Sequence, residues 1–291
     1  MYNKIHVPLF KEVIPKLETI GILNIEESKK VYAYYEIFGQ KNGRLNSSLA
    51  FQNGFLPQHL SPEMKKNLKP NDLEDLFMYF DYKNMEVSVL HWLSKDQLLG
   101  EYLAKDDFYL EIYQLITGNP HNSDKENRIK GKKMFLPIIY GQSPQSLGNR
   151  LNVSLGVAEQ ITERVKTLFS TAVEYVSKYH LHAKENGFCV DIFGKRREFS
   201  KDESYEALCF AVQSPASLMC LEKLINLSRV VDIAYSVHDG YCVYSNKKHW
   251  KQVYKTCHDV LISDSSLFPG LKLKVSCYGG RNLESLKPLL K

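Results

Sequence analysis

The sequence contains the stretch Arg128-Ile-Lys-Gly-Lys132-Lys-Met-Phe-Leu136-Pro-Ile-Ile-Tyr140-Gly141, in which notable side chains recur every four residues. Because an α-helix has 3.6 residues per turn, a step of four advances about 40° beyond a full turn. The recurring residues should therefore form one stripe, with the cations Arg128 and Lys132 at one end and Tyr140 at the other. Such a stripe suits a polyanion beside a flat base, as in a nucleoside triphosphate. An amphipathic helix with a solvated basic start explains the same spacing.

Pro137 interrupts this helical pattern. Proline lacks a backbone N–H and its ring collides with the preceding turn, which costs about 3 kcal/mol in a helix interior. We therefore expect a bend between residues 133 and 137, with Arg128 and Lys132 on the straight half and Tyr140 redirected by the bend.

The composition is that of a globular chain with one large domain or two modest ones: 291 residues, of which 44% are hydrophobic and 24% charged. No run of about 18 apolar residues occurs, so neither a membrane span nor a membrane partner is predicted. The start has no apolar signal core, and the six cysteines form no Cys-x-x-Cys pair. These features predict a cytoplasmic protein that is not secreted, located in the host cytoplasm if it is viral or plasmid-encoded.

Strand-like segments gather at both ends of the sequence, with a helical block between them. Residues 76–81 form an apolar run, and residues 231–237 and 241–244 flank a tight turn at residues 238–240. We expect an α+β fold in which an antiparallel sheet is interrupted by a helical insertion. Single helices are expected over residues 10–23, 85–103 and 157–179.

Two acidic residues occupy related positions on these strands. Asp81 ends the first apolar run, and Asp239 lies in the turn between the last two. If the strands are neighbours, the two carboxylates meet at one end of the sheet, where such a pair can bind two metal ions about 3.5–4 Å apart. One ion would activate an attacking oxygen and the other would orient a phosphate leaving group. Either aspartate taken alone is better explained as an ordinary turn residue.

Three segments resemble, in order and spacing, the polymerase motifs of family A (DNA polymerase I-like) DNA polymerases. Asp81-Tyr-Lys-Asn-Met-Glu86 resembles the first motif, Arg128-x3-Lys132-x7-Tyr140-Gly141 the second and Val237-His-Asp239 the third. Weaker similarity covers residues 43–48, 187–197, 212–217 and 273–279. The resemblance spans about residues 35–291.

The resemblance implies a right-hand polymerase fold with an antiparallel-sheet palm and a helical fingers insertion. The implied parts are an N-terminal helix and palm lead-in (1–42), the first part of the palm (43–110), the fingers (111–186) and the second part of the palm (187–291). A full thumb and an exonuclease domain are not expected. The resemblance therefore implies a minimal polymerase or a split one, in which a second polypeptide supplies the thumb or exonuclease.

The resemblance also implies a role for each matching residue. Asp81 and Asp239 would be catalytic and would hold two Mg²⁺ ions, with the Tyr82 backbone carbonyl as a further ligand. Glu86 would be a steric gate that leaves no space for a ribose 2′-hydroxyl. The residues of the second motif that would bind the deoxynucleoside triphosphate are Arg128, Lys132, Leu136 and Tyr140.

Primer-template DNA is the other implied partner. Arg44 and Gln213 would position the duplex, and His238 would lie near the primer end. The reaction would be in-line attack of the primer 3′-hydroxyl on the α-phosphate.

The sequence departs from the family pattern near the carboxylates and the nucleotide. Gly240 stands where these polymerases usually carry a glutamate, so a third acidic group is missing. Lys83 replaces a small serine and can compete with a metal ion for the carboxylates. Leu136 replaces the usual Phe or Tyr, which leaves discrimination at the sugar 3′ position open.

Two other functions remain open at this point. A single-subunit RNA polymerase shares the Arg-x3-Lys, Tyr-Gly and His-Asp patterns but carries a glycine near the sugar, whereas this chain has Glu86. A non-catalytic palm that binds nucleic acid or scaffolds a replication complex is motivated by Gly240, Lys83 and Pro137. Extension of a primer with deoxy- or ribonucleotides distinguishes the three.

Overall fold

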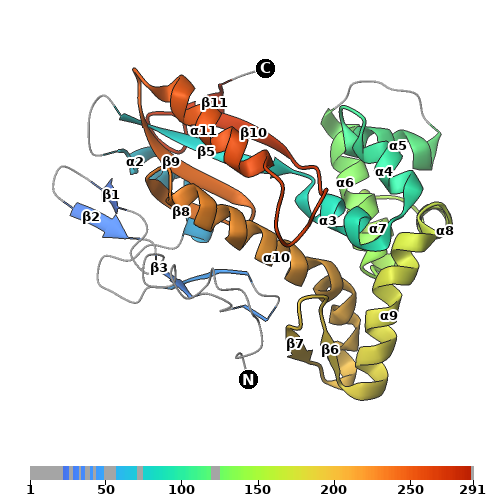
Figure 1. The fold of residues 1–291 in the computed structure, drawn as a ribbon. Helices are drawn as coiled ribbons and strands as arrows, with labels where there is room; N and C mark the ends of the chain where they lie inside the picture. Colours follow the sequence, from blue (N-terminus) through green and yellow to red (C-terminus); the bar gives the residue numbers. More distant parts are fainter. Residues whose placement is uncertain are drawn as a thin grey trace. The chain divides into compact units, whose positions relative to one another are not determined.

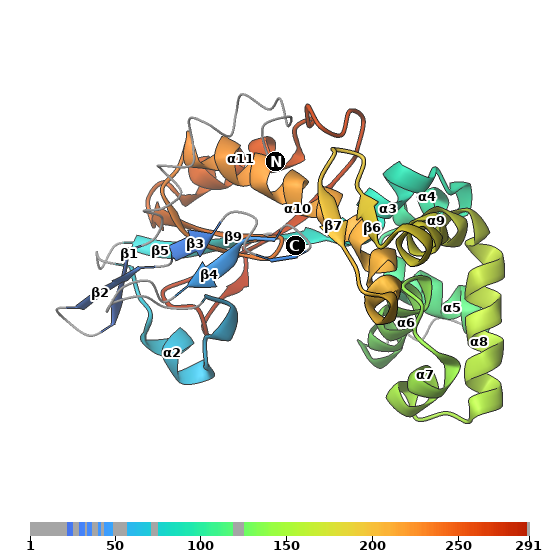
Figure 2. The same cartoon turned by 90° about the horizontal axis from the view of Figure 1, so that it is seen from below.

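The computed structural model describes residues 22–25, 29–32, 34–36, 40–41, 44–48, 57–70, 75–118 and 125–289. Contacts divide the chain into two compact units. The sheet unit comprises residues 1–85 and 216–291, and the helical unit comprises residues 86–215. Figures 1 and 2 show the elements of both units.

The sheet unit is built on a five-stranded antiparallel sheet in the order β11-β10-β5-β9-β8. Its strands are β5 (Asp75–Lys83), β8 (Ile233–Val237), β9 (Gly240–Asn246), β10 (Lys274–Gly280) and β11 (Lys287–Pro288). The strand predicted from the apolar run 76–81 is β5, in the centre of the sheet (Figure 1). Segments from both sides of the helical block pair here, which confirms the expected antiparallel sheet with a helical insertion.

Alternation along β5 sends its side chains to two faces of the sheet. On one face, Tyr82 donates a hydrogen bond from its hydroxyl to the Leu261 carbonyl (2.8 Å) in α11 (Trp250–Ile262). Tyr241 of β9 likewise donates to the Cys220 carbonyl (2.8 Å) in the second half of α10 (Ala207–Ser228). On the other face, Phe77 belongs to a buried apolar cluster. The sheet therefore has α10 and α11 against one face and leaves the other for smaller elements.

The smaller elements of the sheet unit are β1 (Ile22–Ile25), β2 (Lys29–Tyr32), β3 (Tyr34–Glu36), β4 (Asn46–Ser48), the 3₁₀ helix η1 (Pro57–His59) and α2 (Pro62–Asn67). Tyr35 of β3 anchors these elements, because its buried hydroxyl donates to the Ser236 carbonyl of β8 at 2.6 Å. The helix expected over residues 10–23 lies outside the described residues except at its end. Ile22 and Leu23 belong to β1 instead, because they pair with β2, so the prediction is wrong there.

The helical unit contains α3 (Met85–Ser94), α4 (Gln97–Leu103), α5 (Phe108–Thr117), α6 (Lys125–Ile139), α7 (Pro144–Leu151), α8 (Leu155–Leu168) and α9 (Ser170–Asn186). The hairpin β6 (Phe188–Val190) and β7 (Arg196–Glu198), the 3₁₀ helix η2 (Lys201–Glu206) and the start of α10 complete it. Phe135 of α6 lies at its centre, in edge-to-face contact with Phe108 (5.2 Å) and Phe169 (5.0 Å). These aromatic contacts tie α5, α6 and the α8–α9 junction into one core.

Two segments expected as single helices are each two helices. The segment 85–103 breaks at Lys95, which has φ 59°, and at the buried Asp96. One Asp96 carboxylate oxygen accepts from the Leu99 N–H (2.9 Å) and caps α4, while the other accepts from the Ala172 N–H (3.1 Å) in α9. The segment 157–179 breaks at Phe169, whose ring is buried in the aromatic core. At both breaks, the residue that ends the helix makes a long-range contact, and local periodicity does not reveal such contacts.

Residues 201–228 are the one helical stretch, among those that the structure describes, with the length and composition to cross a membrane. Of its apolar window, 72% is buried inside the protein, as is usual for a core helix. The absence of a membrane partner stays a prediction.

Candidate active site

The carboxylate pair lies at one end of the central strands. Asp81 of β5 pairs with Gly240 of β9 on one side and with Ser276 of β10 on the other. Asp239 precedes Gly240 directly, and its carbonyl accepts from the Tyr82 N–H at 3.5 Å. The pairing of β5 with β9 therefore brings Asp81 and Asp239 to the same sheet end, as the strand pattern predicted.

The turn between β8 and β9 fixes the position of Asp239. Val237 pairs with Gly240, so the loop consists of His238 and Asp239 alone. His238 has φ 54°, a left-handed conformation that histidine tolerates better than most side chains, and it is exposed. The Ser236 hydroxyl donates to the Gly240 carbonyl at 3.1 Å and closes the turn. The predicted role of His238 near the primer end stays a prediction.

Tyr79 also lies beside the carboxylates, and the sequence did not single it out. It comes two residues before Asp81 and so belongs to the same face of β5. Its ring stacks on Tyr235, with centroids 6.4 Å apart. Burial raises the pKa of the Tyr79 hydroxyl, and the charges of Asp81 and Asp239 raise it further. The hydroxyl is therefore a neutral group at the edge of an acidic pair.

The donor chemistry of this sheet end fits a divalent cation that is held partly by substrate. Among the described residues there is no group of three or more His, Cys, Asp or Glu side chains placed to hold a metal ion. Mg²⁺ prefers oxygen ligands and usually takes only one or two carboxylates, with water and substrate phosphates supplying the rest. Asp81, Asp239 and the Tyr82 carbonyl are the predicted partial set, and their contact with a metal ion stays a prediction.

In the helical unit, three predicted site residues meet in one polar cluster. Glu86, in the first turn of α3, accepts a hydrogen bond from the Tyr140 hydroxyl at 3.1 Å. Gln213 of α10 donates to both Glu86 carboxylate oxygens at 3.4 Å. Burial, followed by the Glu86 charge, raises the pKa of Tyr140 well above its usual value, so its hydroxyl stays a donor. The cluster fixes the direction of the Glu86 side chain.

The predicted stripe runs along α6. Arg128 and Lys132 are exposed and Leu136 is half-buried, whereas Phe135 and its neighbours Met134, Ile138 and Ile139 are buried. The exposed cations are therefore available to a polyanion. Contact of these residues with a nucleotide stays a prediction.

The helix α6 continues past Pro137 to Ile139, so it neither ends nor is interrupted at the proline. It stops in a Schellman motif, in which the Gln142 N–H bonds to the Pro137 carbonyl (2.8 Å) and the Gly141 N–H to the Ile138 carbonyl (3.0 Å). Gly141 supplies the left-handed φ of 84° that this motif requires. Tyr140 is the cap residue, so the helix end sets its direction. A bend near residues 133–137 stays a prediction.

Asp107 is a partner of Arg128 that the sequence did not reveal. Its carboxylate accepts from Arg128 Nε at 2.7 Å and also from the Leu110 N–H at 3.2 Å, which caps α5. Both side chains of the pair are exposed, at 49% and 37%, so the pair contributes only about 0–1 kcal/mol to stability. Separation of Arg128 from Asp107 therefore costs little.

The hairpin β6–β7 is organised by a buried carboxylate. Asp191 accepts from the backbone N–H groups of Phe193 and Lys195 (both 2.9 Å) and from the Ser214 hydroxyl (2.6 Å). Lys195, Arg196 and Arg197 form a cluster of three consecutive cations in the sequence, and the two arginines begin β7. Asp191 and Gly194, three residues apart, are the sequence signal for this turn, although the Ser214 contact is not local.

Arg44 lies next to β4 in the sheet unit and is half-buried. Its carbonyl accepts from the Gln40 N–H at 3.4 Å. Its predicted contact with the duplex stays a prediction.

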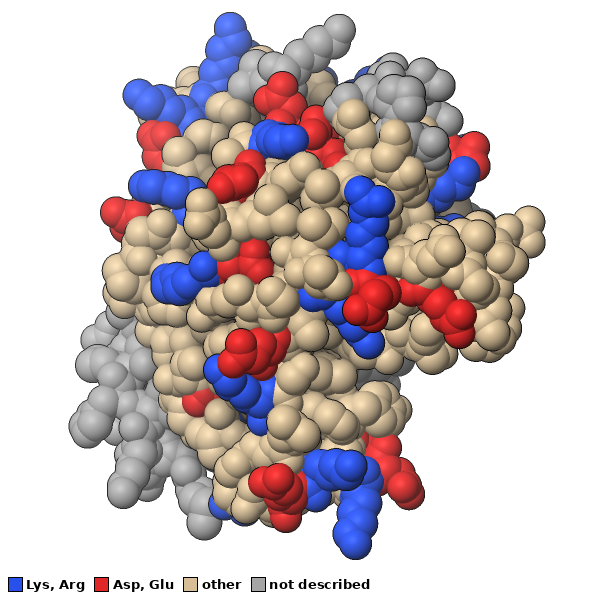
Figure 3. Space-filling model, turned by 90° about the vertical axis from the view of Figure 1, so that its right-hand side faces the viewer, with Lys and Arg blue, Asp and Glu red and all other residues tan. Residues whose placement is uncertain are grey.

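On the face shown in Figure 3, Lys and Arg side chains lie next to Asp and Glu side chains, so no broad basic surface covers it.

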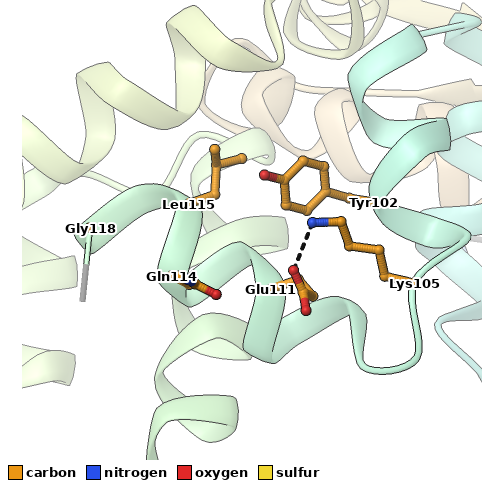
Figure 4. Close-up of a pocket in the computed structure, with 6 residues that line it drawn as sticks. All are labelled: Tyr102, Lys105, Glu111, Gln114, Leu115 and Gly118. Carbon is orange, nitrogen blue, oxygen red and sulfur yellow. Dashed lines mark hydrogen bonds and ion pairs between the residues drawn. The ribbon is translucent and has the colours of Figure 1, made fainter. Parts of the chain in front are cut away.

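A pocket of about 450 Å³ lies on α4 and α5 (Figure 4). Lys105 crosses it, paired with Glu111 at 2.7 Å and 4.0 Å from the Tyr102 ring centroid. The Glu111 hydrogen bond raises the pKa of Lys105. No predicted site residue is among those that line it, which are Tyr102, Lys105, Glu111, Gln114, Leu115 and Gly118.

The family model for DNA polymerase family A matches residues 11–285. The chain therefore belongs to DNA polymerase family A, which confirms the resemblance seen in the motifs. Its similarity to individual relatives is low. A DNA polymerase of Mycobacterium phage D29 is 24% identical over 148 residues, which cover 50% of this chain and 24% of that protein. DNA polymerase I of Bacillus caldotenax is 23% identical over 253 residues, which cover 84% of this chain and 28% of that protein.

Among solved structures, the chain is similar to the POL domain of Pol1 from M. smegmatis, in complex with DNA primer-template and dNTP. The TM-score is 0.76 at 17% identity, over 90% of this chain and 49% of the other. This similarity establishes the fold. The chain spans only about a quarter of the length of the two curated relatives above.

Proposed function

We propose that this chain is a template-directed DNA polymerase that adds deoxynucleotides to a primer 3′-hydroxyl. The observation that carries the proposal is the pairing of β5 with β9, which brings Asp81 and Asp239 together from distant parts of the chain. Membership of DNA polymerase family A supports the same activity. The assignment of palm (43–110 and 187–291) and fingers (111–186) is part of this proposal.

Two Mg²⁺ ions, held by Asp81, Asp239 and the Tyr82 carbonyl, would activate the primer 3′-hydroxyl and neutralise charge on the phosphates. The chain's own side chains bind and orient the substrates. Arg128 binds the triphosphate through its planar guanidinium and Lys132 as a point charge, and Leu136 packs near the sugar.

Glu86 discriminates between sugars in this proposal. Its carboxylate would leave no space for a ribose 2′-hydroxyl, and the hydrogen bonds from Tyr140 and Gln213, which fix the direction of this side chain, support the role. Tyr140 closes over the templating position once the nucleotide is bound. Arg44, Gln213 and His238 contact the primer-template.

The test is Mg²⁺-dependent primer extension by the wild type and by Asp81→Asn and Asp239→Asn. Each substitution is expected to lower the extension rate by at least about 100-fold, because the metal loses a charged ligand. Primer-template binding, measured by fluorescence anisotropy, should change less than threefold. Asp75→Asn, at the other end of β5, is the matched control and should extend normally.

The same assay separates the alternative functions. Preference for ribonucleotides would favour a single-subunit RNA polymerase and would refute the role of Glu86. Binding of primer-template without extension by the wild type, with Mg²⁺ or Mn²⁺, would favour a replication scaffold.

A second polypeptide that supplies a thumb or exonuclease is a further part of the proposal. It predicts that run length on a primed template rises severalfold when the partner is present. A run length equal to that of a complete polymerase with the purified chain alone would contradict it.

A further inference from the structure

The side-chain space of residue 240 is occupied by Tyr79. A Cβ atom placed on Gly240 would overlap the Tyr79 hydroxyl oxygen and would lie 2.5 Å from its Cζ atom. Real Cβ atoms essentially never approach a neighbour within 3.0 Å, so any residue other than glycine at this position displaces the tyrosine. Gly240 and Tyr79 are therefore a matched pair in this chain.

Backbone conformation does not explain Gly240. The described glycines with positive φ are Gly118, Gly141, Gly187, Gly194 and Gly270. Gly240 has an ordinary strand conformation and pairs with Asp81 and Val237. A glycine inside a strand commonly marks the close approach of another group, and here that group is a phenol hydroxyl.

The hydroxyl reaches the end of the sheet at which the carboxylates meet. Residue 240 follows Asp239 directly and lies opposite Asp81, so its side-chain space borders both. The position is the one at which the resembled polymerases usually carry a glutamate. A neutral hydroxyl from the neighbouring strand therefore occupies the place of a third acidic side chain.

We propose that Tyr79 is a positioning residue for the metal-binding pair: its hydroxyl hydrogen-bonds a water ligand of a divalent ion held by Asp81 and Asp239. Mg²⁺ and Mn²⁺ keep several water ligands when only two carboxylates bind them, and such outer-shell partners strengthen metal binding. A hydroxyl can both donate and accept. The proposal rests on the metal-binding role that the proposed function gives to Asp81 and Asp239.

A purely structural role makes a different prediction. The Tyr79 ring stacks on Tyr235 and packs against the core of this sheet face, so the ring alone could explain its presence. Removal of the hydroxyl alone separates the two roles, because Tyr79→Phe keeps the ring. Tyr244→Phe is the matched control, since Tyr244 lies on the same face of the sheet but pairs with Phe77, farther along β5.

The first measurement is Mn²⁺ affinity of the full chain, followed by the electron paramagnetic resonance signal of free Mn²⁺. Tyr79→Phe is expected to weaken Mn²⁺ binding about tenfold, and Tyr244→Phe less than twofold. Thermal melting of each variant shows whether the fold is intact. Equal Mn²⁺ affinity of Tyr79→Phe and the wild type would overturn the proposal.

The second measurement replaces Gly240 and Tyr79, first Gly240 alone and then both residues together. Gly240→Glu alone should lower the melting temperature, because Tyr79 must move. Tyr79→Ser combined with Gly240→Glu leaves space for the carboxylate and should bind Mn²⁺ more tightly than Tyr79→Ser alone. A double variant that binds Mn²⁺ no better than Tyr79→Ser alone would overturn the proposal.

Mn²⁺ binding by Asp81→Asn distinguishes a failure of this inference from a failure of the proposed function. If the wild type binds Mn²⁺ and Asp81→Asn does not, the metal pair stands whatever Tyr79→Phe does. If the wild type binds no Mn²⁺, both proposals fail.

Discussion

At the scale of single residues, Lys195 shows how burial changes the chemistry of a basic cluster. It is only 8% exposed, whereas Arg196, its neighbour in the sequence, is exposed. Burial lowers the pKa of Lys195 to about 8, with the Asp191 charge opposing and the Arg197 charge reinforcing that shift. Sequence alone shows three equivalent cations, and the structure separates one of them.

We predict that Lys195→Met stabilises the protein at neutral pH and that the gain shrinks as pH rises. The folded-state pKa is about 8 and the ordinary value is 10.5, so the unfolded chain binds more protons between these values. Wild-type stability therefore rises with pH in this window, and the variant lacks that rise. Urea unfolding at pH 7, 8, 9 and 10 measures the difference. Lys201→Met, at an exposed position, is the control. A gain in the stability of Lys195→Met that is constant across pH would contradict the prediction.

At the scale of elements, a glycine allows the close packing of α5 and α6. A Cβ atom on Gly131 would overlap the Tyr109 carbonyl oxygen, so the helix backbones can approach only without it. Glycine in a helix costs about 1 kcal/mol relative to alanine, so packing is its reason here. The contact fixes α6, and with it Arg128 and Lys132, against α5.

Gly131→Ala is predicted to destabilise the protein by about 1–3 kcal/mol through overpacking, despite its better helix propensity. Gly156→Ala in α8 is the control, because a Cβ atom there meets nothing within 4 Å, and it should be neutral or stabilising by up to about 1 kcal/mol. Chemical denaturation of both variants provides the comparison. A stabilised Gly131→Ala variant would show that α5 and α6 can separate freely.

Prediction of the elements succeeded where local periodicity decides them. The apolar run of β5 and the four-residue spacing of α6 gave both elements within a few residues. The helix breaks at Asp96 and Phe169 were missed because their cause is tertiary: a carboxylate shared with α9, and an aromatic core. The spacing of apolar and polar residues along the chain does not reveal either contact.

At the scale of the whole molecule, the two units differ in whether they are formed by one continuous segment of the chain or by two. The helical unit is one continuous segment, residues 86–215, whereas the sheet unit joins residues 1–85 to 216–291. The sheet therefore depends on pairings such as β5 with β9, which are far apart in sequence. Loop-closure entropy must be overcome before such pairings form.

Pulsed hydrogen exchange during refolding should therefore show protection in α5, α6 and α8 before it appears in β5 and β9. The helices rely on local contacts that form quickly, and the sheet waits for closure of a long loop. The amides of α11 serve as an internal reference. This helix has local hydrogen bonds but packs on the sheet, so its amides should become protected at the same time as those of β5 and β9. Protection of β5 and β9 at the earliest time would refute this order.

The sequence by itself determined the family motifs, the α+β class and the candidates Asp81, Asp239, Glu86, Arg128, Lys132 and Tyr140, because motif spacing and periodicity are local. Tertiary structure alone decided which side chains meet: Tyr140 and Gln213 on Glu86, Asp107 on Arg128, and Tyr79 in the space left by Gly240. Those contacts join residues of different elements. Their geometry depends on strand register and helix packing, which no local pattern encodes.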